Sequence, residues 1–157
     1  MTAMKKALCL LLCLTMALSL ASCGFPNPFD DRAKKEDIFA YVKENEEALL
    51  ECIEKNEYLS IRLSTNIIQR IDDDGIGHGF VDFDCGGAGF GPGTAYCGFY
   101  YSADDNLTGL WCSPRDSSLL KRSGNGYLWE QSWTNQGDNT YYTENICGHF
   151  YYYEASF

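Results

Sequence analysis

Residues able to do nucleophilic chemistry are few in this chain, which has two histidines and eight cysteines. A catalytic triad needs a nucleophile, a base and a group that orients the base, all within reach. His78 lies in the turn-forming stretch DDDGIGHG, and His149 follows Cys147 by two residues on one predicted strand. Side chains two apart on a strand share a face, so this pair could meet. We expect a structural role for it and predict no catalytic residue.

Carboxylates offer a second kind of chemistry. Asp72–Gly75 begins like a calcium-binding loop, but Ile76 and Phe83 stand where such a loop needs its fifth and twelfth positions to supply ligands. We therefore expect no resident metal and no cofactor, with adventitious calcium at the aspartates left as an alternative. Two carboxylate pairs could serve glycoside hydrolysis, although nothing in the sequence selects them: Asp82 with Asp84, and Glu130 with Glu144.

A glycine-rich stretch, CGGAGFGPG, runs from Cys85 to Gly93. Its spacing fits neither the dinucleotide-binding fingerprint nor the P-loop, because Pro92 and Gly93 stand where a P-loop needs lysine and a hydroxyl. No lysine or arginine occurs between Ile71 and Pro114, so a bound phosphate would meet only negative charge. The stretch is therefore predicted to be the turn of a hairpin.

The segments on either side of this turn, 79–85 and 96–102, alternate between large and small or polar residues. One antiparallel register places three matched pairs on a single face, since the side-chain period of a strand is two. This register makes Cys85 and Cys97 the best candidate for a disulfide, the alternative being two reduced thiols in the hairpin core. The three pairs are Cys85 with Cys97, Phe83 with Phe99, and Val81 with Tyr101.

Aromatic residues make up 15% of the chain and gather in its second half. Tyrosine and tryptophan present an apolar ring with a polar tip, which suits both sugars and protein partners. We predict that an aromatic face of a sheet binds a protein, a peptide or a glycan, the alternative being that these rings form the core. The candidate binding residues are Tyr96, Tyr100, Trp129, Trp133 and Tyr142.

The elements that must position these residues follow from hydrophobic periodicity. Apolar residues at helical spacing predict one amphipathic helix over Asp30–Asn56. Tyr58–Leu63 fits a helix or a strand. The expected fold is α+β, with this N-terminal helix packed on a mostly antiparallel sheet of four to six strands in one domain, 31–157. Predicted strands, besides the hairpin, are Asn66–Ile71, Leu107–Trp111, Tyr127–Trp133 and Cys147–Phe157.

The pattern of residues 1–22 predicts an export signal. Lys5 and Lys6 precede an apolar run, Ala7–Leu20, that is too short to cross a bilayer core of about 30 Å. The run ends in Leu20-Ala21-Ser22-Cys23, which resembles the lipobox of bacterial lipoproteins. The resemblance implies cleavage after Ser22 and a diacylglyceryl group on Cys23, with 1–22 as signal peptide and 23–30 as a lipid-anchored linker. The alternative is an ordinary secretory signal.

The net charge of the chain limits the classes of partner that it can bind. The net charge of −10 repels both nucleic acid and anionic lipid headgroups. We therefore expect no nucleic-acid partner, and we expect membrane association to depend on the lipid at Cys23. The stretch Gly79–Asp105 resembles small lipoproteins of Gram-positive gut bacteria, which implies no known activity. We expect a binding lipoprotein on the extracytoplasmic face of a cell membrane. The alternatives are a small cell-envelope hydrolase and an inhibitor or immunity lipoprotein.

Overall fold

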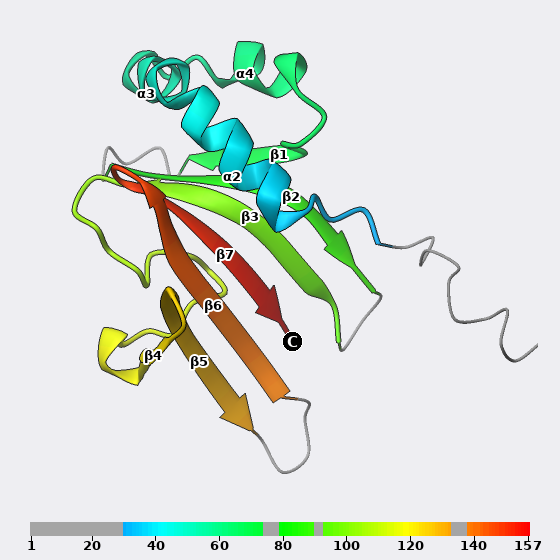
Figure 1. Cartoon of the computed structure of the whole chain (residues 1–157), viewed down its shortest axis with the longest axis vertical. Coiled ribbons are helices and arrows are strands. Elements are labelled where there is room, and N and C mark those ends of the chain that lie inside the picture. Colours follow the sequence, from blue (N-terminus) through cyan, green and yellow to red (C-terminus); the bar gives the residue numbers. More distant parts are fainter. Residues whose placement is uncertain (1–29, 74–78, 90–92, 133–137) are drawn as a thin grey trace, which may run out of the picture.

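The computed structural model describes residues 30–73, 79–89, 93–132 and 138–157. It is an α+β structure in which helices pack against an antiparallel sheet of seven strands, ordered β1-β2-β3-β7-β6-β5-β4 (Figure 1). The helices are α2 (Lys35–Glu44), α3 (Glu46–Lys55) and α4 (Tyr58–Ser64), with a short 3₁₀ turn, η1 (Ser117–Leu119). The strands are β1 (Arg70–Asp73), β2 (Phe80–Ala88), β3 (Ala95–Ser102), β4 (Lys121–Ser123), β5 (Gly126–Ser132), β6 (Asp138–Cys147) and β7 (Phe150–Ser156).

The predicted N-terminal helix is divided at Asn45. The Asn45 side chain donates a hydrogen bond to the Tyr41 carbonyl oxygen at 2.8 Å, and its backbone leaves helical geometry there. An asparagine side chain competes with the helix for backbone partners in this way, which ends α2 and begins α3. The helical segment ends as predicted at Asn56, in the left-handed conformation that helix C-termini favour. Tyr58–Leu63 is helical, within α4.

The predicted helix also begins later than expected, at Lys35 instead of Asp30. Residues 31–33 do not cap a helix but run beside the end of β2. The Ala33 amide donates to the Cys85 carbonyl oxygen at 2.9 Å, and the Asp31 amide donates to that of Gly87 at 3.0 Å. The helix begins only at Lys35, once this pairing ends.

The β2–β3 hairpin has the predicted register, with Phe83 opposite Phe99 and Val81 opposite Tyr101. The register shifts between Asp84 and Gly87, so β2 bulges where residues 31–33 lie against it. Antiparallel strands accommodate one extra residue in this way, at the cost of a local bend. The bulge places Cys85 off the regular pairing with Cys97.

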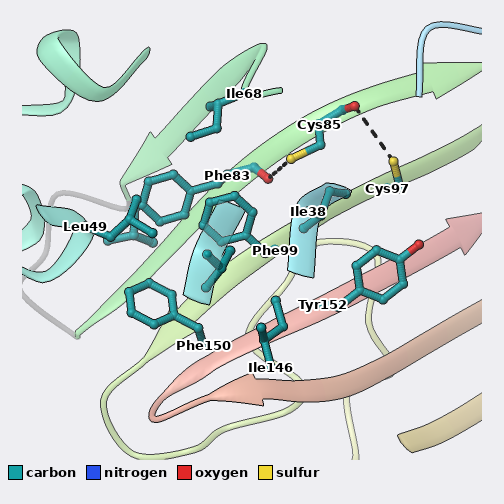
Figure 2. Packing of buried hydrophobic residues seen from close by; sticks show 12 residues of the cluster. Ile38, Leu49, Ile68, Phe83, Cys85, Cys97, Phe99, Ile146, Phe150 and Tyr152 are labelled. Atoms are coloured by element: carbon teal, nitrogen blue, oxygen red, sulfur yellow. Dashed lines mark hydrogen bonds between the residues drawn. The ribbon is translucent and has the colours of Figure 1, made fainter. Parts of the chain in front are cut away.

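One face of the sheet, the helix face, packs against α2 and α3. Ile38, Val42 and Leu49 are fully buried there, and Phe83 stacks on Phe99 with ring centroids 4.5 Å apart. Figure 2 shows Ile38 and Leu49 meeting the stacked rings of Phe83 and Phe99 in this core. Burial of each such aliphatic side chain stabilises the fold by about 1.5–3 kcal/mol. This is the helix-on-sheet core that the periodicity predicts.

The opposite face, the loop face, is covered by chain instead of helix. The long connection from β3 to β4, residues 103–120, crosses it and buries Leu110 and Cys112 among tyrosines of the sheet. A row of stacked rings runs beneath it across three strands, from Phe80 through Tyr100 to Tyr151, with centroids 5.1 and 5.3 Å apart. The sheet therefore has an aromatic core on both sides.

Two expectations about strands are wrong. The sheet has seven strands, not four to six, because the segment from Asp138 to Ser156 folds into two long strands and β4 adds a short edge. Leu107–Trp111 is part of the connection, and only the end of Asn66–Ile71 joins β1. Ile68 and Leu110, the buried apolar residues of these segments, pack onto the sheet faces and do not pair as strands.

Candidate functional site

The cysteines of the described part, Cys52 to Cys147, are free thiols. Cys85 Sγ donates to the Phe83 carbonyl oxygen at 3.5 Å, while Cys97 Sγ contacts the carbonyl oxygens of Ala33 and Cys85 (Figure 2). Each sulfur thus has a backbone acceptor, across the bulge that displaces Cys85. Burial raises the pKa of Cys97 to about 12 and that of Cys85 well above its usual value, so neither is a nucleophile. A Cys85–Cys97 disulfide stays a prediction for the oxidised protein.

His149 and Cys147 do not form a pair. Cys147 packs at the edge of the helix-face core, and burial together with Glu46 raises its thiol pKa. His149 lies in the turn between β6 and β7, and its Nδ1 is 2.8 Å from Asp105 Oδ1, which also accepts from the Tyr151 hydroxyl at 2.7 Å. Imidazole and thiol therefore have separate partners, while His78 is outside the described residues.

Glu130 and Glu144 do not form an acid–base pair either. Glu130 lies opposite Thr140 on β6, four residues along the strand from Glu144. Glu144 is tied to Lys35 Nζ at 2.7 Å and accepts from the Tyr142 hydroxyl. Burial acts to raise its pKa, but the Lys35 and Tyr142 contacts outweigh it and lower the pKa. This carboxylate anchors α2 to the sheet.

The predicted aromatic patch is not assembled on one face. Tyr142 contributes to the helix-face cluster, whereas Trp129 belongs to the loop-face cluster, and both are half-buried. Tyr100 is fully buried, with its hydroxyl 2.9 Å from Thr143 Oγ1. Trp133 lies outside the described residues. Of the four predicted residues that the structure describes, Tyr96 is the one that meets other aromatic rings at an exposed site.

That exposed site is built around Trp111. Leu110 and Cys112 are buried on either side of it, so the backbone presents Trp111 outward with 61% of its surface exposed. Its ring stacks on Phe157 with centroids 5.4 Å apart and meets the edge of Tyr96 at 5.5 Å. We call these three rings, Tyr96, Trp111 and Phe157, the aromatic platform. It is held in place by the end of β7 and the start of β3.

A polar groove of about 610 Å³ lies beside the platform, between Trp111 and the strands β1 and β2, of which β1 is the edge of the sheet. Arg70 Nη2 lies 3.0 Å from Asp72 Oδ2 and 3.6 Å from Asp84 Oδ2, and Asp84 Oδ1 accepts from the Gly86 amide at 2.9 Å. Gln69 is held by a hydrogen bond of its side chain to the Asp31 carbonyl oxygen. These contacts orient the planar polar groups of Gln69, Arg70 and Asp84 in the groove.

Asp82 lies on the same face of β2 as Asp84 but beneath the chain that covers the sheet. It is 5% exposed, and burial raises the pKa of its carboxyl to about 7. Its neighbours Tyr153 and Cys112 are buried as well. Asp82 does not line the groove, so the Asp82–Asp84 pair has one member out of reach of a polymer.

Trp111 and Phe157 are the site residues that sequence reasoning missed. The sequence pattern predicts a strand for the apolar segment Leu107–Trp111, whereas the segment belongs to the β3–β4 connection and presents Trp111 outward. A signal was present in the polar residues 113–118, SPRDSS, because they show that the preceding segment is not continued in a sheet. No sequence pattern marks Phe157 as a site residue, because it reaches Trp111 only through the pairing of β7 with β3.

Within the described ranges, no group of three or more histidine, cysteine, aspartate or glutamate side chains is placed to hold a metal ion. Among the same residues, no helix is long and apolar enough to span a membrane. Asp72 of the calcium-like stretch is paired with Arg70, and Asp74 is not described. Comparisons with protein-family models, curated proteins and solved structures gave no match.

Proposed function

We propose that this chain is a lipid-anchored binding protein on the extracytoplasmic face of a cell membrane, and that it binds glycan on its aromatic platform. Residues 1–22 act as the signal peptide, Cys23 carries the lipid, residues 23–30 form the linker, and 31–157 form the binding domain. Two acyl chains would suffice for stable attachment, because a single chain binds a membrane only marginally. The observation that carries the binding role is the exposure of Trp111, stacked on Phe157 beside an ordered polar groove.

The chemistry of the site favours a glycan over the other expected ligands. A pyranose ring has an apolar face that stacks on indole, and hydroxyls that bond to carboxylate, amide and guanidinium groups. A protein partner needs about 800 Å² of surface on each side, with an apolar centre. The other exposed large hydrophobic residues among those described, Leu59, Leu63 and Leu119, lie on α4 and η1. The platform is thus isolated, as suits a ligand of sugar width.

The hydrolase alternative has less support. A glycosidase needs two carboxyl groups that flank the scissile bond. Asp84 lines the groove, but Asp82 is buried behind it, and His149 is bound to Asp105 elsewhere. The described thiols that are most deeply buried have raised pKa values. Binding without turnover is therefore the better account of this groove.

The test is to apply the intact protein in detergent to an array of neutral oligosaccharides, including chitohexaose, cellohexaose and xylohexaose. We expect binding that is lost in Trp111→Ala and weakened in Tyr96→Ala. Leu119→Ala is the matched control, because it removes an exposed hydrophobic residue of the same connection that does not line the groove. Absence of binding by the wild type, or equal binding by Trp111→Ala, would refute the proposal, and release of shortened sugars would favour the hydrolase.

A further inference from the structure

Asp82 lies directly under the segment that presents Trp111. Cys112 is buried close enough to Asp82 for the two to interact electrostatically, and Leu110 is buried in the same cluster. Gly109 packs on Phe80, where an added methyl group would come within 2.5 Å of the ring. The segment Leu110–Cys112 is therefore seated closely on β2 and β3. We call the surface of β2 and β3 beneath this segment its seat, and the seat contains the carboxyl group of Asp82.

One oxygen of that carboxyl group has no partner. Asp82 Oδ1 is buried without a hydrogen bond in the described structure, while Tyr153 acts as a hydrogen-bond partner to the side chain. A buried carboxylate left short of partners is costly, whereas a neutral carboxyl group is tolerated. The seat is therefore suited to the protonated form of Asp82.

The charged neighbours of Asp82 reinforce this preference. Asp84 on the same strand and Asp72, directly opposite on β1, both disfavour a further negative charge. Arg70 is the cation that acts on Asp82 from β1, and it is already engaged by Asp72 and Asp84. The groups that face it from β3, β7 and the covering segment are Tyr100, Tyr153 and Cys112, whose own pKa values are raised, so that they stay neutral.

We propose that Asp82 is a proton-dependent seat for the segment Leu110–Cys112, so that glycan binding at the platform is stronger on the acidic side of neutrality. This inference rests on the proposed function for its binding consequence, but the seat itself does not. When Asp82 loses its proton, the carboxylate must gain water, and the covering segment is what excludes water from it. Release of Leu110 and Cys112 then frees Trp111 from Phe157 and Tyr96, and the platform is lost.

The pH dependence of the seat is set by the single proton that Asp82 binds. Burial holds the pKa of Asp82 at about 7 when the segment is seated, and water returns it toward 3.8 when the segment opens. The ratio of open to seated molecules therefore rises about tenfold between pH 6 and pH 8. Binding of a glycan that requires the seated segment weakens over the same range.

The seat is tested without any ligand by ¹⁹F NMR of the intact protein labelled with 5-fluorotryptophan, with the Trp111 signal assigned from Trp111→Phe. We expect this signal to titrate with a midpoint near pH 7, and to stop titrating in Asp82→Asn. Asp84→Asn removes a neighbouring negative charge and should lower the midpoint without abolishing the titration. His149→Gln should leave it unchanged, because His149 lies beside the start of β7, whereas Trp111 stacks on Phe157 beyond the other end of that strand.

A Trp111 signal that ignores pH, or that titrates equally in Asp82→Asn, would overturn the seat. The binding consequence is tested by measuring the affinity for the best oligosaccharide of the array at pH 6 and pH 8. Weaker binding at pH 8 in the wild type but not in Asp82→Asn supports the coupling, and pH-independent binding by the wild type overturns it. If no oligosaccharide binds at either pH, the proposed function fails, while the ¹⁹F result still decides the seat.

Discussion

Asp82 links the stability of the loop face to pH. Burial raises its pKa from 3.8 to about 7, so the folded protein holds a proton that the unfolded chain releases between about pH 4 and pH 7. An acid with a raised pKa destabilises the fold once it is ionised, so stability falls as the pH rises through this window. The full difference corresponds to roughly 4 kcal/mol if the segment stays seated.

Substitution Asp82→Asn should therefore remove much of this pH dependence. We expect the melting temperature of Asp82→Asn to exceed that of the wild type at pH 8, where the wild-type carboxyl is ionised. At pH 4, where the wild-type carboxyl is neutral, the two should melt at similar temperatures. Calorimetry across pH 4–8 makes the comparison, and parallel curves for both proteins would contradict this account of Asp82.

At the residue scale, the sequence reveals residue types but not their surroundings. The alternation of β2 predicts that Asp82 and Asp84 share a face, and they do. It cannot predict that the connection from β3 to β4 covers one of them and leaves the other in a groove. The sequence likewise predicts Tyr100 as a binding residue, although the residue is fully buried, because the strand pattern does not show whether a loop covers a tyrosine.

At the element scale, β2, β3 and β7 depend on a close approach at Gly98. A methyl group there would lie 2.4 Å from the Phe83 carbonyl oxygen and 2.8 Å from the Tyr153 ring. Neither neighbour can move without disturbing the centre of the sheet. Gly87 lies in the same hairpin, but its nearest contact would be a looser 3.2 Å, to the Ala95 carbonyl oxygen.

We therefore expect Gly98→Ala to lower the free energy of unfolding by about 3 kcal/mol, at the upper end of the cost of overpacking. Gly87→Ala is the matched control and should lower it by about 1 kcal/mol or less. Urea unfolding followed by circular dichroism measures both. Equal losses in the two variants would show that the close packing described at Gly98 is incorrect.

The hairpin was predictable because its alternation is local and both strands carry matched residues. The break at Asn45 was not, since an asparagine on the apolar stripe fits one long helix as well as the end of two short ones. The β3–β4 connection was the hardest element, because its apolar residues are buried against a sheet face formed partly by strands that follow it in the chain. Local periodicity holds no information about such packing.

For the molecule as a whole, membrane attachment is proposed through residues that precede the described structure. The chain has 22 acidic and 12 basic residues, so it is not attracted electrostatically to anionic lipids. Attachment should thus depend on Cys23 alone. We expect Cys23→Ser to abolish the diacylglyceryl mass increment and to move the protein from the membrane fraction to the soluble or secreted fraction.

Mass spectrometry and fractionation of the native and Cys23→Ser proteins make this comparison. Lys5→Ser is a suitable control, because it alters the leader without touching the proposed lipid site, and it should leave the lipid in place. A wild-type protein with an unmodified Cys23 thiol, or with residues 1–22 still attached, would contradict the anchor while leaving the binding platform untouched.

NMR of the tryptophan indole N–H groups tests most directly whether glycan binds on the aromatic platform at Trp111, as we propose. The intact protein is titrated at pH 6 with the oligosaccharide that binds best on the array. We predict that the Trp111 signal shifts in proportion to occupancy, while the half-buried Trp129 does not respond. Saturation of binding with an unmoved Trp111 signal would contradict the claim.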